Sequence, residues 1–218
     1  MFNFKYILYI VVLYAYSTCY AGSYEDFFTA IKRDDAGAVS TLLQRGFDAN
    51  TRNPAGQHAL YLAIREPSPK VTAVLINWPK IDVEARNAQD ESPLMLASLQ
   101  GLTELCRQLI AKGADVNKPG WTALHYAATG GHLVLMTLLL DSHAYIDAQS
   151  PNNTTPLMMA AHYGTPAAVK LLLEAGADPL LKNDQNLSAI DFAHRASRTE
   201  SSEIIAAFVR GRQPKGKW

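Results

Sequence analysis

The stretch TALHYAA at residues 122–128 decides the fold, because it returns as TPLMMAA at residues 155–161. Related strings stand on either side, SPLMLAS at residues 92–98 and SAIDFA at residues 188–193. The sixth letter of each string is an alanine, and two earlier alanines fit the same register. A near-constant period of about 33 residues is typical of a solenoid of stacked repeats. The six anchor alanines are Ala30, Ala63, Ala97, Ala127, Ala160 and Ala193.

A second string supports this register. A glycine follows the anchor in RGFDAN at 45–50, KGADVN at 112–117 and AGAD at 175–178, and His143 takes the glycine's place in SHAYID at 142–147. Two independent strings in one register indicate that the repeats run through most of the chain.

Each unit contains its own helix signals. A Thr or Ser followed by Pro favours a helix start, since the hydroxyl caps free amides and Pro suits the first turn. Apolar runs such as LCRQLI at 105–110 and VKLLL at 169–173 predict a second helix. The glycine then ends that helix in the left-handed conformation, and Ala-Asp-x-Asn turns the chain. A unit is therefore helix, turn, helix and hairpin.

These strings resemble those of the ankyrin repeat family, with its TPLHxAA and LLLxxGADxN patterns. The resemblance spans Ser23 to Gly211 and implies an all-α ankyrin-repeat solenoid of about six helix-turn-helix units joined by β-hairpin loops. We expect an ankyrin repeat domain over 22–211 and a basic tail over 212–218. The expected units are 23–52, 53–86, 87–117, 118–149, 150–182 and 183–211.

The family's histidine, which braces the hairpin to the next helix, is kept only at His125. Its loss elsewhere predicts softer hairpins or compensation by apolar packing. Between Ala97 and Ala127 three residues are missing, which predicts a shortened loop at 117–121; one extra residue between Ala63 and Ala97 is placed at 65–69. The other units carry Tyr61, Met95, Met158 and Asp191 at the histidine position.

Charge and motifs exclude several function classes. Lys plus Arg equals Asp plus Glu at 20 each, so no positive excess favours nucleic acid. The six histidines share no zinc-motif spacing, and there is no phosphate loop or nucleophile elbow. We therefore expect no enzyme activity, no metal and no cofactor.

The amino terminus has the layout of a secretory signal peptide. Lys5 precedes the apolar run 6–16 and small residues lead to Ala21, which predicts cleavage between Ala21 and Gly22. An uncleaved anchor and lipidation at Cys19 are alternatives. Cleavage leaves Cys106 as the only thiol, so no intramolecular disulfide forms. An exported protein of ankyrin type points to the bacterial periplasm, with secretion or anchoring by an uncleaved signal as alternatives.

The resemblance also implies where a partner binds, because the family uses hairpin tips and exposed first-helix positions. Apolar and aromatic residues are the usual anchors of interfaces. Such residues occupy these positions on three consecutive units, namely Leu99, Trp121, His162 and Tyr163. Alternatively, Trp121 folds onto the stack and Tyr163 covers a turn. Tyr126 is assigned to a mostly buried column, because the residues at the equivalent position are apolar, namely Leu62, Leu96, Met159 and Phe192. The predicted partner-binding residues are Arg65, Glu66, Glu91, Leu99, Gln100, Trp121, Thr129, His162, Tyr163 and Arg195.

The sequence thus predicts a non-catalytic interaction module exported to the periplasm. We expect it to be monomeric alone, to bind one protein partner and not nucleic acid, and to have no stable membrane insertion after signal cleavage. One alternative is an immunity or inhibitor protein that neutralises a secreted toxin or lipase. Others are a secreted effector and a membrane-anchored structural protein.

Overall fold

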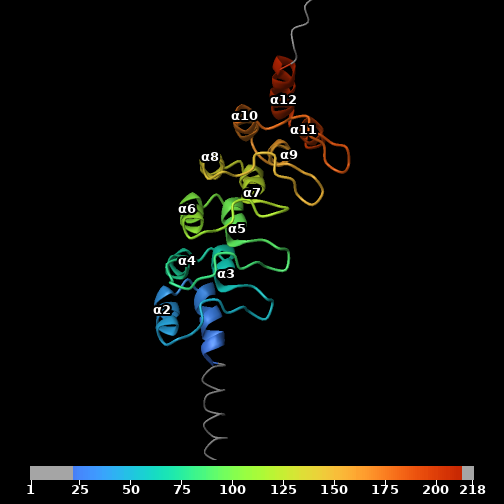
Figure 1. Cartoon of the computed structure of the whole chain (residues 1–218). Helices are drawn as coiled ribbons and strands as arrows, with labels where there is room; N and C mark the ends of the chain where they lie inside the picture. Colours follow the sequence, from blue (N-terminus) through green and yellow to red (C-terminus); the bar gives the residue numbers. More distant parts are fainter. Residues whose placement is uncertain (1–21, 213–218) are drawn as a thin grey trace, which may run out of the picture. The chain divides into compact units, whose positions relative to one another are not determined.

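The computed structural model describes residues 22–212. They fall into two compact units, one up to Ala88 and one from Gln89 onward. The predicted signal peptide, its cleavage residue Ala21 and the tail residues 213–218 lie outside the described residues. Each unit is built from pairs of helices connected by long loops (Figure 1).

The first unit contains a helix over residues 22–32 and three further helices. Phe27 and Ile31 of the 22–32 helix are fully buried, as is Val39 of the next helix. Those three helices are α2 (Ala36–Gln44), α3 (Ala59–Arg65) and α4 (Pro69–Ile76). Because α4 packs against both α2 and α3, its apolar residues close the core of this unit.

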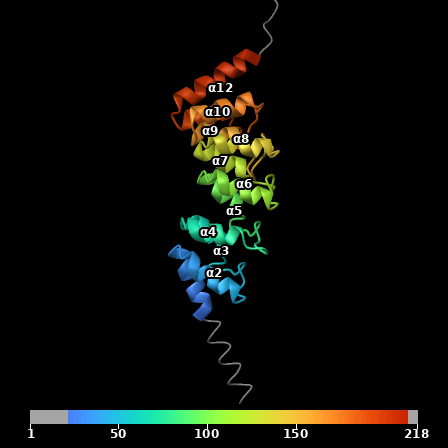
Figure 2. The same cartoon turned by 90° about the vertical axis from the view of Figure 1, so that its left-hand side faces the viewer.

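The second unit stacks four helix pairs. Its first helices pack in the order α5, α7, α9, α11, and its second helices follow in a parallel row (Figure 2). Their bounds are α5 (Pro93–Leu99), α6 (Thr103–Ala111), α7 (Ala123–Gly130), α8 (Leu133–Asp141), α9 (Pro156–His162), α10 (Pro166–Glu174), α11 (Ala189–Arg195) and α12 (Thr199–Arg212).

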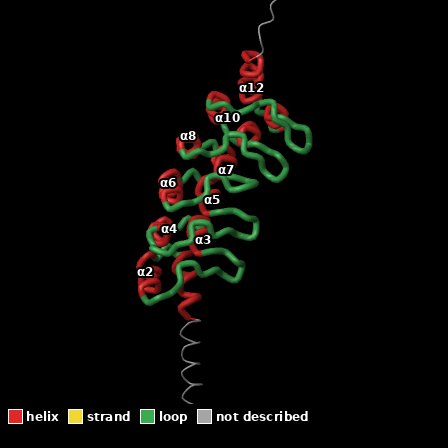
Figure 3. Tube along the Cα trace, in the orientation of Figure 1, coloured by secondary structure: helices red, strands yellow, loops and turns green. Residues whose placement is uncertain are grey.

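The long loops between repeats contain single turns, and no regular strand forms within residues 22–212 (Figure 3). One isolated antiparallel bridge joins Arg52 and His58. In the fifth repeat the loop is closed by a hydrogen bond of 3.0 Å from Ser150 N to Thr154 O. The hairpin-like shape is therefore held by single turns rather than by a β-ladder.

Small residues allow the first helices to approach closely. The anchor alanines are all buried, and Ala127 and Ala160 have no exposed surface. At the end of α9, a Cβ on Gly164 would collide with the carbonyl oxygen of Ala128 in α7. The repeat strings therefore carry alanine and glycine where neighbouring backbones touch.

The helix boundaries follow the sequence signals. Ser92 accepts a hydrogen bond of 3.3 Å from Met95 N, and Pro93 is the first residue of α5. At the ends of second helices the backbone is left-handed, with φ of +91° at Gly113, +107° at Gly176 and +65° at His143. His143 thus occupies a conformation that suits glycine.

The predicted position of the extra residue was wrong. The anchor is followed by an N-cap at the same spacing in every repeat, Ala63 by Ser68 as Ala97 by Leu102, so nothing is inserted at 65–69. Asp82 accepts from Glu84 N as Asp115 accepts from Asn117 N, yet Asp82 comes one residue late. The insertion therefore lies at 77–80, where Trp78 and Pro79 replace the usual helix-ending glycine.

The shortened loop at 117–121 is stabilised by one lysine. Lys118 is buried, and its amine donates a hydrogen bond of 3.0 Å to Pro119 O and forms an ion pair with Asp90. Burying an ammonium group requires such partners. The two contacts of the Lys118 amine therefore hold the shortened loop in place.

Candidate functional site

A hollow of about 330 Å³ lies on the second unit. It is built from three consecutive repeats, since α5, α7, α9 and the loop before α7 all contribute side chains. Small pockets of this kind, mostly apolar with a few polar groups, are the usual binding sites on proteins. Its lining consists of Leu99, Trp121, His125, Tyr126, Thr129, Met159 and Tyr163.

His125 is the buried member of this lining, and its hydrogen bonds fix its protonation. Its Nδ1 accepts from Thr122 N at 3.1 Å, so Nε2 carries the proton and donates to Thr154 O at 2.9 Å. Burial lowers the pKa of His125 to about 4, although its bond to Thr154 O opposes the change. The imidazole is therefore neutral, and it is a structural brace rather than an acid or a base.

Aromatic rings pack around this brace. The indole of Trp121 lies edge-on to the His125 ring, with centroids 5.2 Å apart and planes at 74°. Such edge-to-face contacts add to the stabilisation that burial gives. Trp121 is half-buried, so it both packs on the repeat and borders the hollow.

Two apolar side chains of the lining are openly exposed. Leu99 at the end of α5 is 40% exposed, and Tyr163 just after α9 is 56% exposed. Exposed apolar groups that gather around a depression indicate an interaction site more strongly than scattered ones. These two residues therefore present the hollow to a partner.

Most polar atoms of the lining already have partners inside the protein. The Tyr126 hydroxyl donates to Glu91 Oε1 at 2.9 Å, and the Thr129 hydroxyl donates to His125 O at 2.8 Å. Within residues 22–212, the Trp121 indole N–H and the Tyr163 hydroxyl have no such partner. The hollow is therefore lined mainly by carbon atoms. The Trp121 indole N–H and the Tyr163 hydroxyl are its two polar groups without a hydrogen bond within the described residues.

The structure brings together four of the predicted binding residues, Leu99, Trp121, Thr129 and Tyr163. Glu91 lies beside them through its bond to Tyr126. These residues lie close together because they occupy equivalent or adjacent positions of successive repeats, and such positions on stacked helices are side by side.

The other predicted residues lie elsewhere. Arg65 and Glu66 belong to the first unit and form an exposed ion pair of 3.4 Å. Gln100 is the C-cap residue of α5, and its side chain is exposed. Arg195 donates a hydrogen bond of 3.3 Å to Gln185 Oε1. His162 is half-buried, and its Nδ1 donates to Phe192 O at 3.2 Å, so it joins two repeats.

Sequence reasoning missed His125, Tyr126 and Met159 as part of the lining. Tyr126 and Met159 were assigned to a buried column because their equivalents are apolar. In the second unit that column is only half-buried, as Leu96 and Phe192 also show. An apolar residue type does not reveal whether the neighbouring helix covers it, so only the packing exposed these side chains.

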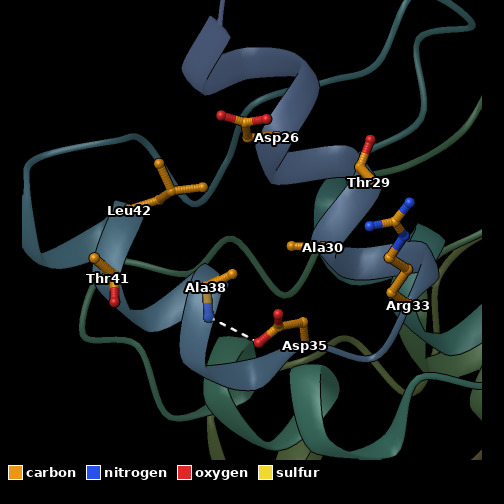
Figure 4. Close-up of a pocket in the computed structure, with 8 residues that line it drawn as sticks. All are labelled: Asp26, Thr29, Ala30, Arg33, Asp35, Ala38, Thr41 and Leu42. Carbon is orange, nitrogen blue, oxygen red and sulfur yellow. Dashed lines mark hydrogen bonds between the residues drawn. The ribbon is translucent and has the colours of Figure 1, made fainter.

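The first unit carries hollows of a different kind. One lies between the 22–32 helix and α2, and Figure 4 shows the side chains of Asp26, Arg33 and Asp35 around it. Asp35 is occupied in capping Ala38 N at 2.9 Å. This hollow is more polar than the one on the second unit, as expected for the outer face of a terminal repeat.

The described residues have neither a grouping that could hold a metal ion nor a helix that could span a membrane. Between residues 22 and 212, no group of three or more His, Cys, Asp or Glu side chains is arranged to hold a metal ion. Nor does any helix in that range have the length and apolarity to cross a membrane. Cys106 is buried, and burial raises the pKa of its thiol to about 11.

Both the sequence and the fold are similar to those of known proteins. The family description "Ankyrin repeats (3 copies)" matches residues 27–119 and 94–183. The chicken (Gallus gallus) nuclear factor NF-kappa-B p105 subunit is 31% identical over 169 residues, which cover 74% of this chain but 17% of that protein. The chain thus spans about a sixth of the length of this curated relative.

Solved structures of other proteins have a fold similar to that of this chain. An ankyrin repeat domain from Acinetobacter baumannii is 25% identical with a TM-score of 0.71, covering 84% of this chain and 97% of that one. A chain in the complex of the predatory endopeptidase Bd0816 from Bdellovibrio bacteriovorus with the immunity protein Bd3460 is 26% identical with a TM-score of 0.72, at the same coverage. With its repeat register, its buried anchor alanines and these matches, the chain belongs to the ankyrin repeat family.

Proposed function

We propose that this protein is a non-catalytic binding module that captures one partner protein through the hollow of its second unit. Ankyrin repeats are protein-protein interaction modules. The observation that carries the proposal is the joint exposure of Leu99 and Tyr163 around a hollow whose polar atoms are largely satisfied. A partner side chain that enters it removes carbon surface from water without breaking an internal hydrogen bond.

The rigidity of the site supports this role. Trp121 packs on His125, and His125 is held to Thr122 and Thr154. A surface that is ordered before binding loses little conformational freedom when a partner arrives. A few large apolar side chains can then supply most of the affinity.

A matched pair of variants tests the site. Leu99→Ala with Tyr163→Ala removes the exposed lining, whereas Leu180→Ala with Tyr145→Ala removes exposed side chains outside it, which are 65% and 67% exposed. We expect the first double variant to lose at least about tenfold in affinity for a partner isolated by crosslinking from the source cell, about 1.4 kcal/mol. Equal loss in both, or none in the first, contradicts the proposal.

We further propose that the protein is exported to the periplasm after cleavage before Gly22. The basis is the sequence layout of residues 1–21, with a short apolar run and small residues before Ala21. Mass spectrometry of the protein purified from its native cell tests this. A mature chain that starts at Gly22 supports export, and an intact amino terminus favours the anchored alternative.

A second candidate function is that of an immunity or inhibitor protein against a secreted hydrolase or toxin. The similarity to a chain from an endopeptidase and immunity protein complex favours it. Co-expression with the product of a neighbouring gene tests this role. We expect the wild type to relieve toxicity and the Leu99 and Tyr163 double variant to fail. Relief that is independent of the hollow would place inhibition on another surface.

A further inference from the structure

Arg198 lies beside the hollow and has no carboxylate partner among the described residues. Arg198 donates from Nη2 to Tyr163 O at 3.3 Å, which fixes the guanidinium next to a residue of the lining. A guanidinium has five N–H donors, and none of the others has a protein acceptor within residues 22–212. The side chain is exposed, so its remaining donors face outward beside Tyr163.

The position of Arg198 is not explained by the stability of its own helix. It directly precedes α12, where the helix macrodipole disfavours a cation. Arg195 is different, because it lies in the last turn of α11, where a cation is favourable. Arg195 also lacks a carboxylate partner in the described chain and contacts Gln185 instead. Two exposed guanidinium groups therefore follow the hollow on the side of the last repeat.

The charge on the other side has the opposite sign. Glu91 accepts the Tyr126 hydroxyl on the side of the third repeat. Between Glu91 and Arg198, the first helices α5, α7, α9 and α11 pack in order. The hollow is therefore apolar in the middle, with a carboxylate toward α5 and guanidinium groups toward α11.

Resting on the proposed function of the hollow, we infer that its occupant is an acidic, apolar peptide segment, in which a bulky apolar side chain fills the hollow and a neighbouring carboxylate pairs with Arg198. An arginine can bind a carboxylate through two parallel N–H···O bonds. Exposed ion pairs add modest affinity, but they select between partners of opposite charge. Specificity for an acidic partner thus comes from Arg198, and the bulk of the affinity comes from the apolar lining.

The test uses the full chain and three synthetic peptides. The first repeats Phe-Glu, the second repeats Phe-Lys and the third repeats Ala-Glu. The readout is the indole N–H signal of Trp121 in nitrogen-15 NMR spectra, identified among the signals of Trp78, Trp121 and Trp218 with a Trp121→Phe variant. We expect the Phe-Glu peptide to shift this signal at about tenfold lower concentration than either of the others at low salt.

Two variants locate the charge effect. Arg198→Gln should weaken binding of the Phe-Glu peptide about three- to fivefold, and binding of the Phe-Lys peptide should stay the same or become slightly tighter, because a repelling charge is removed. Arg33 is an exposed arginine of the first unit (Figure 4). The control variant Arg33→Gln should leave the binding of both peptides unchanged. Because Arg198 also holds Tyr163 O, the unfolding midpoint of Arg198→Gln is measured, and Arg198→Lys should recover part of the preference for Phe-Glu.

Several outcomes overturn the inference. They are equal binding of the Phe-Glu and Phe-Lys peptides, no shift with either, and an unaltered preference in Arg198→Gln. A shift by inorganic phosphate alone, as large as that by the Phe-Glu peptide, would make the basic end a general anion site and also overturn it. If the Leu99 and Tyr163 double variant still loses its natural partner in these cases, the proposed function stands while the acidic occupant fails.

Discussion

His125 Nε2 donates a hydrogen bond of 2.9 Å to the carbonyl oxygen of Thr154, and this bond connects α7 to the loop of the following repeat. The same imidazole accepts from Thr122 N, so it also caps its own helix. The histidine position therefore performs two tasks, one within a repeat and one between repeats.

The other repeats keep only parts of this arrangement. Met95 and Met158 accept from their N-cap amides through sulfur at 3.4 Å, which is a weak interaction. Asp191 accepts from Ser188 N at 2.8 Å, and its bonds to Ser188 hold the pKa of its carboxyl below the usual value. In the first unit, Tyr61 instead accepts from Asn87 through its hydroxyl. At each of these positions a hydrogen bond therefore takes over part of the histidine's role.

Acid should destabilise the protein between pH 6.5 and about 4. Burial lowers the pKa of both His58 and His125 from 6.5 to about 4. The unfolded chain then binds more protons than the folded one in this range, so the free energy of unfolding falls as the pH falls. Each histidine contributes up to about 3 kcal/mol to that loss.

The control for this prediction is His125→Met, the residue that other repeats use. It should lower the free energy of unfolding at pH 7 by about 1–3 kcal/mol, because the bond to Thr154 O is lost, and it should flatten the pH dependence. Urea unfolding followed by circular dichroism at several pH values measures both. A variant with the full wild-type pH dependence would exclude His125 as its source.

Asp147→Asn should stabilise the second unit. Asn117 accepts from Tyr145 N and donates to His143 O, both at 2.8 Å, whereas the equivalent Asp147 only accepts, from Asp178 N. An asparagine there could also donate to the carbonyl of residue 176. We expect a gain of about 0.5–1 kcal/mol at pH 7.

The pH dependence of this variant provides its check. Burial, and then the charge of Asp178, raise the pKa of the Asp147 carboxyl above 3.8, so ionisation costs stability as the pH rises through that region. The gain from Asp147→Asn should therefore be larger at pH 7 than at pH 3. The reciprocal change Asn117→Asp should destabilise; a stabilising result there would contradict the argument.

Gly164→Ala should be among the more damaging substitutions in the second unit. Its Cβ would meet the carbonyl oxygen of Ala128 and lie 2.9 Å from Ala160 O, both of which are backbone atoms that cannot move aside cheaply. We expect a loss of about 2–3 kcal/mol in thermal or urea unfolding.

Gly211→Ala is the matched control, since no atom of the described part of the chain lies within 4 Å of the added methyl group and the residue is helical. Its stability should be unchanged or raised by up to about 1 kcal/mol. Similar losses for both variants would show that close backbone contact between α7 and α9 is not the cause.

His143→Gly should stabilise the end of α8. His143 has φ of +65°, while Gly46, Gly113 and Gly176 occupy this conformation in other repeats. Relief of the strained backbone should outweigh the greater freedom of glycine in the unfolded chain, giving a net gain of up to about 1 kcal/mol. The unfolding midpoint of the variant, compared with that of His143→Ala, measures it. A lower midpoint for glycine than for alanine would refute the prediction.

The sequence by itself determined the repeat, the signals that begin and end its helices, and its register apart from the position of the extra residue between Ala63 and Ala97. These features follow from local chemistry. Ser92 and Pro93 favour the start of a helix and Gly113 favours its end, and neither effect depends on residues distant in the chain. Register also included Leu99, Trp121, Thr129 and Tyr163 among ten predicted binding residues, since equivalent positions of stacked helices are neighbours.

Only the tertiary structure decided which of those side chains share one hollow. Residue type cannot say whether a neighbouring helix covers a side chain, so Tyr126 and Met159 were assigned to the interior although the packing of α5, α7 and α9 leaves them half-buried. The hydrogen bonds that Glu91, His162 and Arg198 make with residues of adjacent repeats arise between segments about 30 residues apart, where chain sequence specifies spacing but not contact.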